Sequence, residues 1–137
     1  MKIEPGLSLK SLTLEPITRE QLRAYAEASG DPNRIHLDDE VAREFGLPGI
    51  IAHGMLIAAM MSEKAQQAMA QELGLAGYRL TKYQTRFRSM TFLGDTPMVG
   101  GSVKSIQENS LTLDLQVKNQ RGETVATGLA QFQLLPQ

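Results

Sequence analysis

Residues 52–73, which read AHGMLIAAMMSEKAQQAMAQEL, form a long stretch of helix-favouring residues that contains no proline. Its first half, Met55–Met61, is apolar at every position, whereas its second half is largely polar and keeps Ala65, Ala68, Met69 and Leu73 at spacings of three and four. A helix segment that is apolar on every face must be buried on every face. The stretch therefore predicts one long helix, ended by Gly74, whose N-terminal half is enclosed by the rest of the fold.

The pattern after Gly77 changes to the two-residue period of β-strands. Residues 111–117 alternate strictly between an apolar and a polar side chain, which is typical of a strand with one buried face. Strand-like runs over 78–90, 96–106 and 124–135 are joined by short connections, which favours antiparallel neighbours. We therefore expect an α+β fold in which an antiparallel sheet covers the long helix.

The N-terminal third is predicted to be mainly helical. Residues 6–15 can form a first strand, and a helix capped by Thr18 is expected over residues 19–29. Gly30 is a natural end for this helix, and the proline that follows it predicts a loop over residues 31–37.

The composition excludes several functional classes. A length of 137 residues predicts one domain over residues 1–137. Fourteen basic and fifteen acidic side chains leave a formal net charge of −1, so neither nucleic acid nor a membrane is an expected partner. The chain has no cysteine, which rules out disulfides, thiolate metal ligands and cysteine nucleophiles. The longest apolar run is too short to span a bilayer, and the N-terminus lacks a signal-peptide pattern, so a cytoplasmic location is expected.

The first candidate for chemistry is a pair of side chains on the predicted loop. Asp31 and His36 are five residues apart. A carboxylate and an imidazole at that spacing can converge on one water molecule and act as general acid and base. A structural role is also open at this point, because Asp31 followed by Pro32 is a common way to begin a turn or a helix.

The second candidate is the pair His53 and Gly54 at the start of the long helix. A helix N-terminus offers free backbone N–H groups and a partial positive charge, and a glycine there lets a substrate carbonyl approach. Such a site can act as an oxyanion hole. Alternatively, Gly54 only relieves crowding where the helix meets the sheet. His53 is expected to be a hydrogen-bonded structural residue that points away from the site.

Together the two segments resemble the MaoC-like, (R)-specific enoyl-CoA hydratases. Residues 25–42 read YAEASGDPNRIHLDDEVA and match that family's aromatic residue followed by S-G-D-x-N-P-aliphatic-H. The sequence AHGML at residues 52–56 is a second hallmark of the family. Arg34 departs from the pattern, because it stands where the family usually has a rigid proline. The resemblance implies a hot-dog fold, an antiparallel sheet wrapped around one central helix, working as a homodimer.

The resemblance also implies roles for individual residues. Asp31 and His36 would hold and activate the water that adds to a trans-2-enoyl thioester, giving an (R)-3-hydroxyacyl thioester in a reversible reaction. The N–H of Gly54 would bind the thioester oxygen, Ser62 would line the substrate site, and Asn33 would hold the loop. The reaction needs no metal and no cofactor. Coenzyme A or acyl carrier protein would carry the acyl group, as in fatty acid metabolism.

Two other functions remain open. Hot-dog thioesterases hydrolyse similar thioesters and often use a carboxylate on the central helix, and Glu63 is the only acidic residue in the first three turns of this one. A non-catalytic acyl-thioester-binding protein, or a subunit of a heteromeric dehydratase, would be marked by loss of Asp31 or His36. Both are present, which favours the hydratase.

Overall fold

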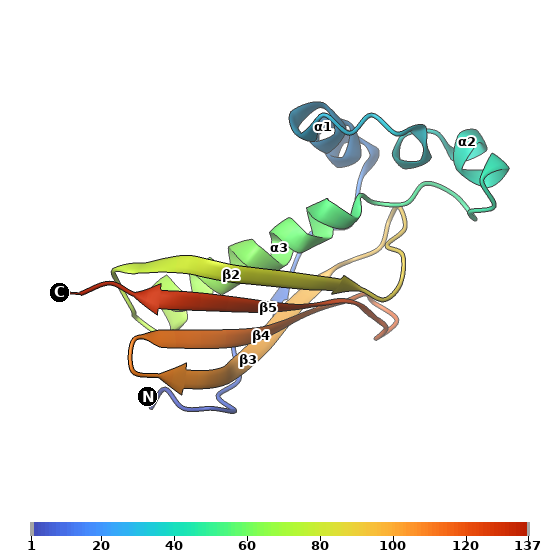
Figure 1. The fold of residues 1–137 in the computed structure, drawn as a ribbon. Helices are drawn as coiled ribbons and strands as arrows, with labels where there is room; N and C mark the ends of the chain where they lie inside the picture. Colours follow the sequence, from blue (N-terminus) through green and yellow to red (C-terminus); the bar gives the residue numbers. More distant parts are fainter. Residues whose placement is uncertain (1, 137) are drawn as a thin grey trace.

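The computed structural model describes residues 2–136 and confirms the predicted combination of an antiparallel sheet and one long helix (Figure 1). The strands follow the order β1-β3-β4-β5-β2, and each pair of neighbours is antiparallel. Helix α3 lies across one face of this sheet. The strands are β1 (Leu12–Thr13), β2 (Tyr78–Phe87), β3 (Met98–Gln107), β4 (Ser110–Lys118) and β5 (Thr124–Leu134).

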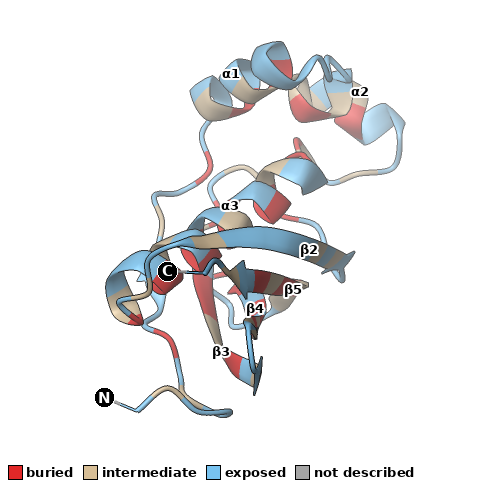
Figure 2. Cartoon of the chain, turned by 60° about the vertical axis from the view of Figure 1, so that its left-hand side comes forward, coloured by how far each residue is buried: buried red, intermediate tan, exposed pale blue. Residues whose placement is uncertain are grey.

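The core lies between α3 and the inner face of the sheet. Helix α3 spans Gly54–Gln67 and continues as a π-helical segment over Ala68–Glu72, so the predicted long helix is confirmed apart from its first residues. The apolar positions of residues 111–117 are all buried, as their alternation predicts. Figure 2 shows buried residues in α3, β3, β4 and β5, whereas β2 is mostly exposed. None of the helices in residues 2–136 has the length and apolar character needed to cross a bilayer.

Complete enclosure of the N-terminal half of α3 is not observed in the single chain. Ile57 and Met60 are buried against the core, but Met55 is 65% exposed and Ala59 is exposed as well. The prediction was wrong for this side of the helix because one sheet can cover only one side of a helix. The uncovered side keeps an apolar surface that a single copy of the chain leaves open to solvent.

The N-terminal helices form a separate layer beyond the start of α3, away from the sheet (Figure 1). They are α1 (Arg19–Ser29) and α2 (Asp39–Glu44). Helix α1 has the predicted bounds, and the side chain of Thr18 accepts a hydrogen bond from the N–H of Gln21 at 3.1 Å. Gly30 ends the helix with a φ of 73°, a conformation that glycine adopts without strain.

The predicted first strand is much shorter than expected. Only Leu12–Thr13 pairs regularly with β3, and Ser8 makes an isolated bridge to Ser102. The rest of residues 6–15 follows β3 without forming a continuous ladder, although Gly6, Leu7 and Leu9 make separate backbone hydrogen bonds to that strand.

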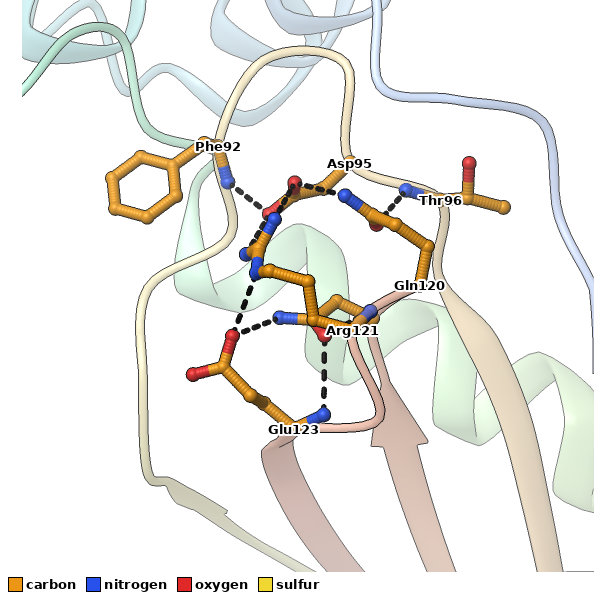
Figure 3. A network of polar contacts seen from close by, with 7 residues as sticks. Phe92, Asp95, Thr96, Gln120, Arg121 and Glu123 are labelled. Atoms are coloured by element: carbon orange, nitrogen blue, oxygen red, sulfur yellow. Dashed lines mark hydrogen bonds and ion pairs between the residues drawn. The ribbon is translucent and has the colours of Figure 1, made fainter.

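A polar network fixes the loop between β2 and β3 (Figure 3). The buried carboxylate of Asp95 accepts hydrogen bonds from the N–H of Phe92 at 2.9 Å, from Gln120 at 2.9 Å and from Arg121 at 3.1 Å. Burial raises the pKa of Asp95, but these donors outweigh that effect and hold its pKa below the ordinary value. The loop is thereby tied to the turn between β4 and β5.

This loop in turn supports the chain that leads into α3. The carbonyl oxygen of Thr91 accepts a hydrogen bond from the N–H of Ala52 at 2.8 Å, and Ile51 makes an antiparallel bridge to Phe92. The Asp95 network therefore holds, through two backbone contacts, the residues that immediately precede the helix.

Replacing Asp95 by alanine should lower the free energy of unfolding by about 1–3 kcal/mol, because three donors lose a charged acceptor. Urea unfolding at pH 7 measures this difference. The exposed pair of Lys2 and Glu4 provides the control, since Lys2→Ala should change stability by less than about 0.5 kcal/mol.

The effect of Asp95→Ala should also depend on pH. A carboxylate whose pKa is lowered by folding stabilises the protein above the unfolded-state pKa, about 4, and loses that contribution as the pH falls through its folded-state value. The difference between Asp95→Ala and the parent chain should shrink below about pH 4. An undiminished difference at low pH would contradict this role.

Candidate functional site

Three side chains with acid–base chemistry meet at the N-terminal end of α3. Asp31 comes from the loop after α1, His36 ends a short 3₁₀ turn, and His53 is the residue that precedes the first turn of α3. One ligating atom of each residue lies within 4.8 Å of the others. Asp31 is exposed, whereas both imidazoles are buried. The structure thus brings together the predicted pair of Asp31 and His36, and adds His53 to it.

Short-range hydrogen bonds shape the loop that carries Asp31 and His36. Oδ1 of Asp31 accepts from the N–H of Asn33 at 3.2 Å, and Oδ1 of Asn33 accepts from the N–H of Ile35 at 3.2 Å. These bonds build the turn that presents His36. They leave the second carboxylate oxygen of Asp31 without a protein donor among residues 2–136. Asn33 therefore has the loop-holding position that was expected of it.

The hydrogen bonding of His36 decides which of its nitrogens can take a proton. Its Nδ1 lies 2.8 Å from the carbonyl oxygen of Ile51. A carbonyl oxygen can only accept, so Nδ1 must carry the hydrogen. In the neutral ring Nε2 then keeps a free lone pair. His36 is consequently set up to accept a proton at Nε2.

His53 lies directly against His36. The two ring centroids are 3.8 Å apart and the ring planes differ by 26°, and Nε2 of His53 lies 3.3 Å from the carbonyl oxygen of Asp31. Desolvation by burial lowers the pKa of His53, and the neighbouring His36 lowers it further. The expected hydrogen bond is present, but the expectation that His53 points away is wrong. Its ring forms one wall of the site.

Gly54 is the first residue of α3 and adjoins a small apolar cavity. A Cβ atom at this position would lie 3.2 Å from a ring carbon of Phe87, so the ring leaves little room for a side chain. The cavity has a volume of about 160 Å³, and its walls are mostly apolar. A helix N-terminus at the edge of an apolar space can bind a carbonyl group that carries a hydrocarbon chain. The cavity is lined by Ile51, Ala52, Gly54, Ile57, Phe87, Ser89, Met90, Thr91 and Val125.

Ser62 is not brought into this cluster. It lies on α3 eight residues after Gly54, which corresponds to roughly 12 Å along the helix. Its hydroxyl accepts a hydrogen bond from Gln66 at 3.4 Å, and it lines a different groove together with the exposed Glu63.

Arg34 does not disturb the loop in which it replaces the family's proline. Its guanidinium bonds to Asp38 at 3.0 Å in an exposed ion pair. The 3₁₀ turn forms with Asn33 as its N-terminal cap. The turn therefore depends on the side chain of Asn33 rather than on a rigid ring at position 34.

A carboxylate and two imidazoles are also the ligand types that zinc prefers. The lone pairs of an imidazole lie in its ring plane, and the planes of His36 and His53 are nearly parallel. One nitrogen of each ring is also held by a carbonyl oxygen. Both rings would have to rotate before they could bind one ion, so the arrangement suits proton transfer better than metal binding.

Known proteins share this fold and this arrangement of segments. Residues 3–125 match the family described as MaoC like domain. The (R)-hydratase of Aeromonas caviae involved in PHA biosynthesis has a structure with a TM-score of 0.81 and 25% identity, covering 97% of this chain and 98% of its own. The R-hydratase PhaJ1 from Pseudomonas aeruginosa gives a TM-score of 0.82 and 30% identity over 98% and 84% of the two chains.

A UPF0336 protein of Thermobifida fusca, whose name assigns no activity, is 32% identical over 120 residues, which are 82% of this chain and 79% of that protein. The family match extends over both the loop that carries Asp31 and His36 and the helix that begins at Gly54. With its five-stranded sheet around a central helix, the chain belongs to the MaoC-like dehydratases and has their hot-dog fold.

Proposed function

We propose that the chain is an (R)-specific hydro-lyase that adds water reversibly to trans-2-enoyl thioesters. The observation that carries the proposal is the meeting of the Asp31 carboxylate and the His36 imidazole, whose Nε2 is left free to take a proton, beside His53, the residue that precedes the first N–H of α3. The hydratases at 25% and 30% identity support the reaction type. The acyl group would be carried by coenzyme A or by acyl carrier protein.

The proposed reaction uses one water molecule and returns all of its atoms to the product. Asp31 and His36 hold the water, and its oxygen bonds to C3 while one of its protons passes to the pair. The electrons of the double bond move toward the thioester carbonyl, whose oxygen becomes an enolate bound by the N–H of Gly54. The enolate then collapses, and the proton held by the pair is delivered to C2. Dehydration follows the same steps in reverse.

The acid–base pair of Asp31 and His36 and the oxyanion-hole N–H of Gly54 are needed together. A positioned acid–base group contributes typically about 10²–10⁴-fold to the rate. One oxyanion-hole donor contributes roughly 3–4 kcal/mol. No step oxidises or reduces the substrate, so the proposed reaction proceeds without a redox cofactor, and proton transfer by Asp31 and His36 takes the place of a metal-bound hydroxide.

The thioesterase alternative has less support from the geometry. Glu63 lies on α3 nine residues after Gly54, or roughly 13 Å along the helix, and its side chain is exposed. A carboxylate at that distance does not share a substrate atom with the N–H of Gly54. Glu63 is therefore useful as a control position in the test of the hydratase proposal.

We also infer that the chain works as a homodimer joined along β2. This strand has ten residues and pairs only with β5 among the described residues, so one complete edge of backbone donors and acceptors is free. Large apolar side chains are exposed on or beside this edge and at the start of α3. They are Met55, Leu80, Phe87 and Met90. A second copy paired along β2 would extend the sheet and cover apolar surface next to Gly54.

Asp31→Asn and His36→Ala should each lower the turnover of crotonyl-CoA by about 10²–10⁴-fold, because each removes a proton-transferring group, and Asp31→Asn does so with little change in volume. Loss of enoyl-thioester absorbance measures hydration, and a thiol assay on the same samples measures hydrolysis. Glu63→Gln is the matched carboxylate control and should retain hydration, with EDTA making no difference to the parent chain.

Near-normal hydration by Asp31→Asn would contradict the assignment. Thiol release that is abolished by Glu63→Gln would replace the hydratase by a thioesterase. If a panel of enoyl thioesters on both carriers gives neither reaction, the chain is an acyl-thioester-binding subunit rather than an enzyme by itself.

In solution the chain should have twice the mass of one copy by size-exclusion chromatography with light scattering. Leu80→Lys, which places a charge on the β2 edge, should weaken the dimer by about tenfold or more. Ile106→Lys is the control, because Ile106 has a similar exposure on β3, away from that edge. A monomeric parent chain, or equal effects of the two variants, would overturn the β2 interface.

A further inference from the structure

We propose that His53 is a positioning residue for the hydration reaction: its neutral ring fixes the plane of the His36 imidazole and, through the backbone of Asp31, the spacing of the reacting pair. This inference rests on the proposed function of the same site. It gives a role to the one buried imidazole that the proposed proton transfers do not use.

The first argument concerns the freedom of the His36 ring. The imidazole turns about its Cβ–Cγ bond, and its one hydrogen bond to the protein, from Nδ1 to Ile51, restrains that rotation through a single ring atom. The flat face of His53, with centroids 3.8 Å apart, blocks that rotation on one side. The ring of His53 is itself held by an edge contact with the Tyr25 ring, whose centroid lies 4.8 Å from its own. It is also buried, with 2% of its surface exposed. The orientation of Nε2 in His36 therefore depends on His53.

The second argument concerns Asp31 and Gly54. Because a carbonyl oxygen only accepts, the contact at 3.3 Å between Nε2 of His53 and the Asp31 carbonyl places the hydrogen on Nε2. This bond connects the backbone of the exposed catalytic loop to the start of α3. His53 is also the residue immediately before Gly54. One side chain thus links the three groups on which the proposed reaction depends.

The third argument concerns charge. With the hydrogen on Nε2, Nδ1 of His53 is an unprotonated nitrogen, and it is buried without a hydrogen-bond partner among residues 2–136. The titratable groups that face the ring are Tyr25 from α1, Asp31 from the loop and His36 from the 3₁₀ turn. A proton on Nδ1 would lie buried beside a ring that must itself become cationic during the reaction. A neutral aromatic face can instead stabilise that transient cation.

The test separates the contribution of the His53 ring from that of its N–H donor. His53→Phe keeps a flat ring and loses the donor, whereas His53→Gln keeps an N–H donor and loses the ring. We expect His53→Gln to lower kcat by about 10- to 100-fold, as misplacement of a catalytic group does, with KM changed much less. His53→Phe should retain more of kcat than His53→Gln. Val103→Ala is the stability control, since it opens space in the core on β3 and should leave kcat unchanged.

A wild-type kcat in His53→Gln would overturn the proposal, as would a kcat loss of the same size in Val103→Ala at equal loss of stability. Equal kcat values for His53→Phe and His53→Gln would show that the ring does not contribute to the positioning.

A measurement on the unsubstituted chain covers the case in which the variants fail to fold. Nitrogen-15 NMR of the imidazoles should show His53 with a protonated Nε2 and an unprotonated Nδ1 at pH 6, where an ordinary histidine with a pKa of about 6.5 is mostly charged. Two protonated nitrogens in His53 at that pH would overturn the proposal. This result does not depend on turnover, so it stays distinct from a failure of the hydratase assay.

Discussion

The packing of α3 against one face of the sheet is the constraint on which the rest of the structure depends. Buried side chains of the helix and of β3, β4 and β5 form a single core, so the helix can neither slide nor turn without loss of apolar contact. The N-terminal end of α3 is therefore a fixed point. Every group of the candidate site is placed relative to it, either by belonging to the helix or by bonding to the residues just before it.

The chemistry proposed for this fixed point comes from a loop that has little packing of its own. Residues 31–36 are mostly exposed and are shaped by turn hydrogen bonds. One backbone hydrogen bond and the side-chain bonds of His36 and His53 tie the loop to residues 51–53, and those residues are tied to the loop after β2. A rigid core thus positions an exposed loop through a few directional bonds, which is a common way to keep a reactive group both accessible and aligned.

Elements with a local signal could be predicted from the sequence, and contacts between distant segments could not. The bounds of α1 follow from Thr18 and Gly30, and the buried face of β4 follows from the alternation of residues 111–117. Proximity of Asp31 and His36 was likewise suggested by their spacing. The exposed side of α3 was missed, because the extent to which a helix is covered depends on the number of layers around it rather than on its own residues.

The stacking of His53 on His36 was also missed. These residues are 17 positions apart, and the sequence around neither of them predicts an aromatic contact. The only available signal was that both histidines of the chain fall within the two family motifs. For Ser62, the resemblance implies a place in the lining of the substrate site, and helical geometry puts it about two turns away from Gly54, so its role stays a prediction.

The Asp95 network gives a surface turn an influence on the interior of the molecule. Arg121 is about half exposed, has no contact with the cavity beside Gly54, and would be regarded as freely replaceable from its position alone. Yet it holds Asp95, which orders the loop that bonds to the residues leading into α3. Substitutions in the β4–β5 turn would therefore reach beyond the surface, because they would loosen the segment that leads into α3 and with it the alignment of the groups proposed to react.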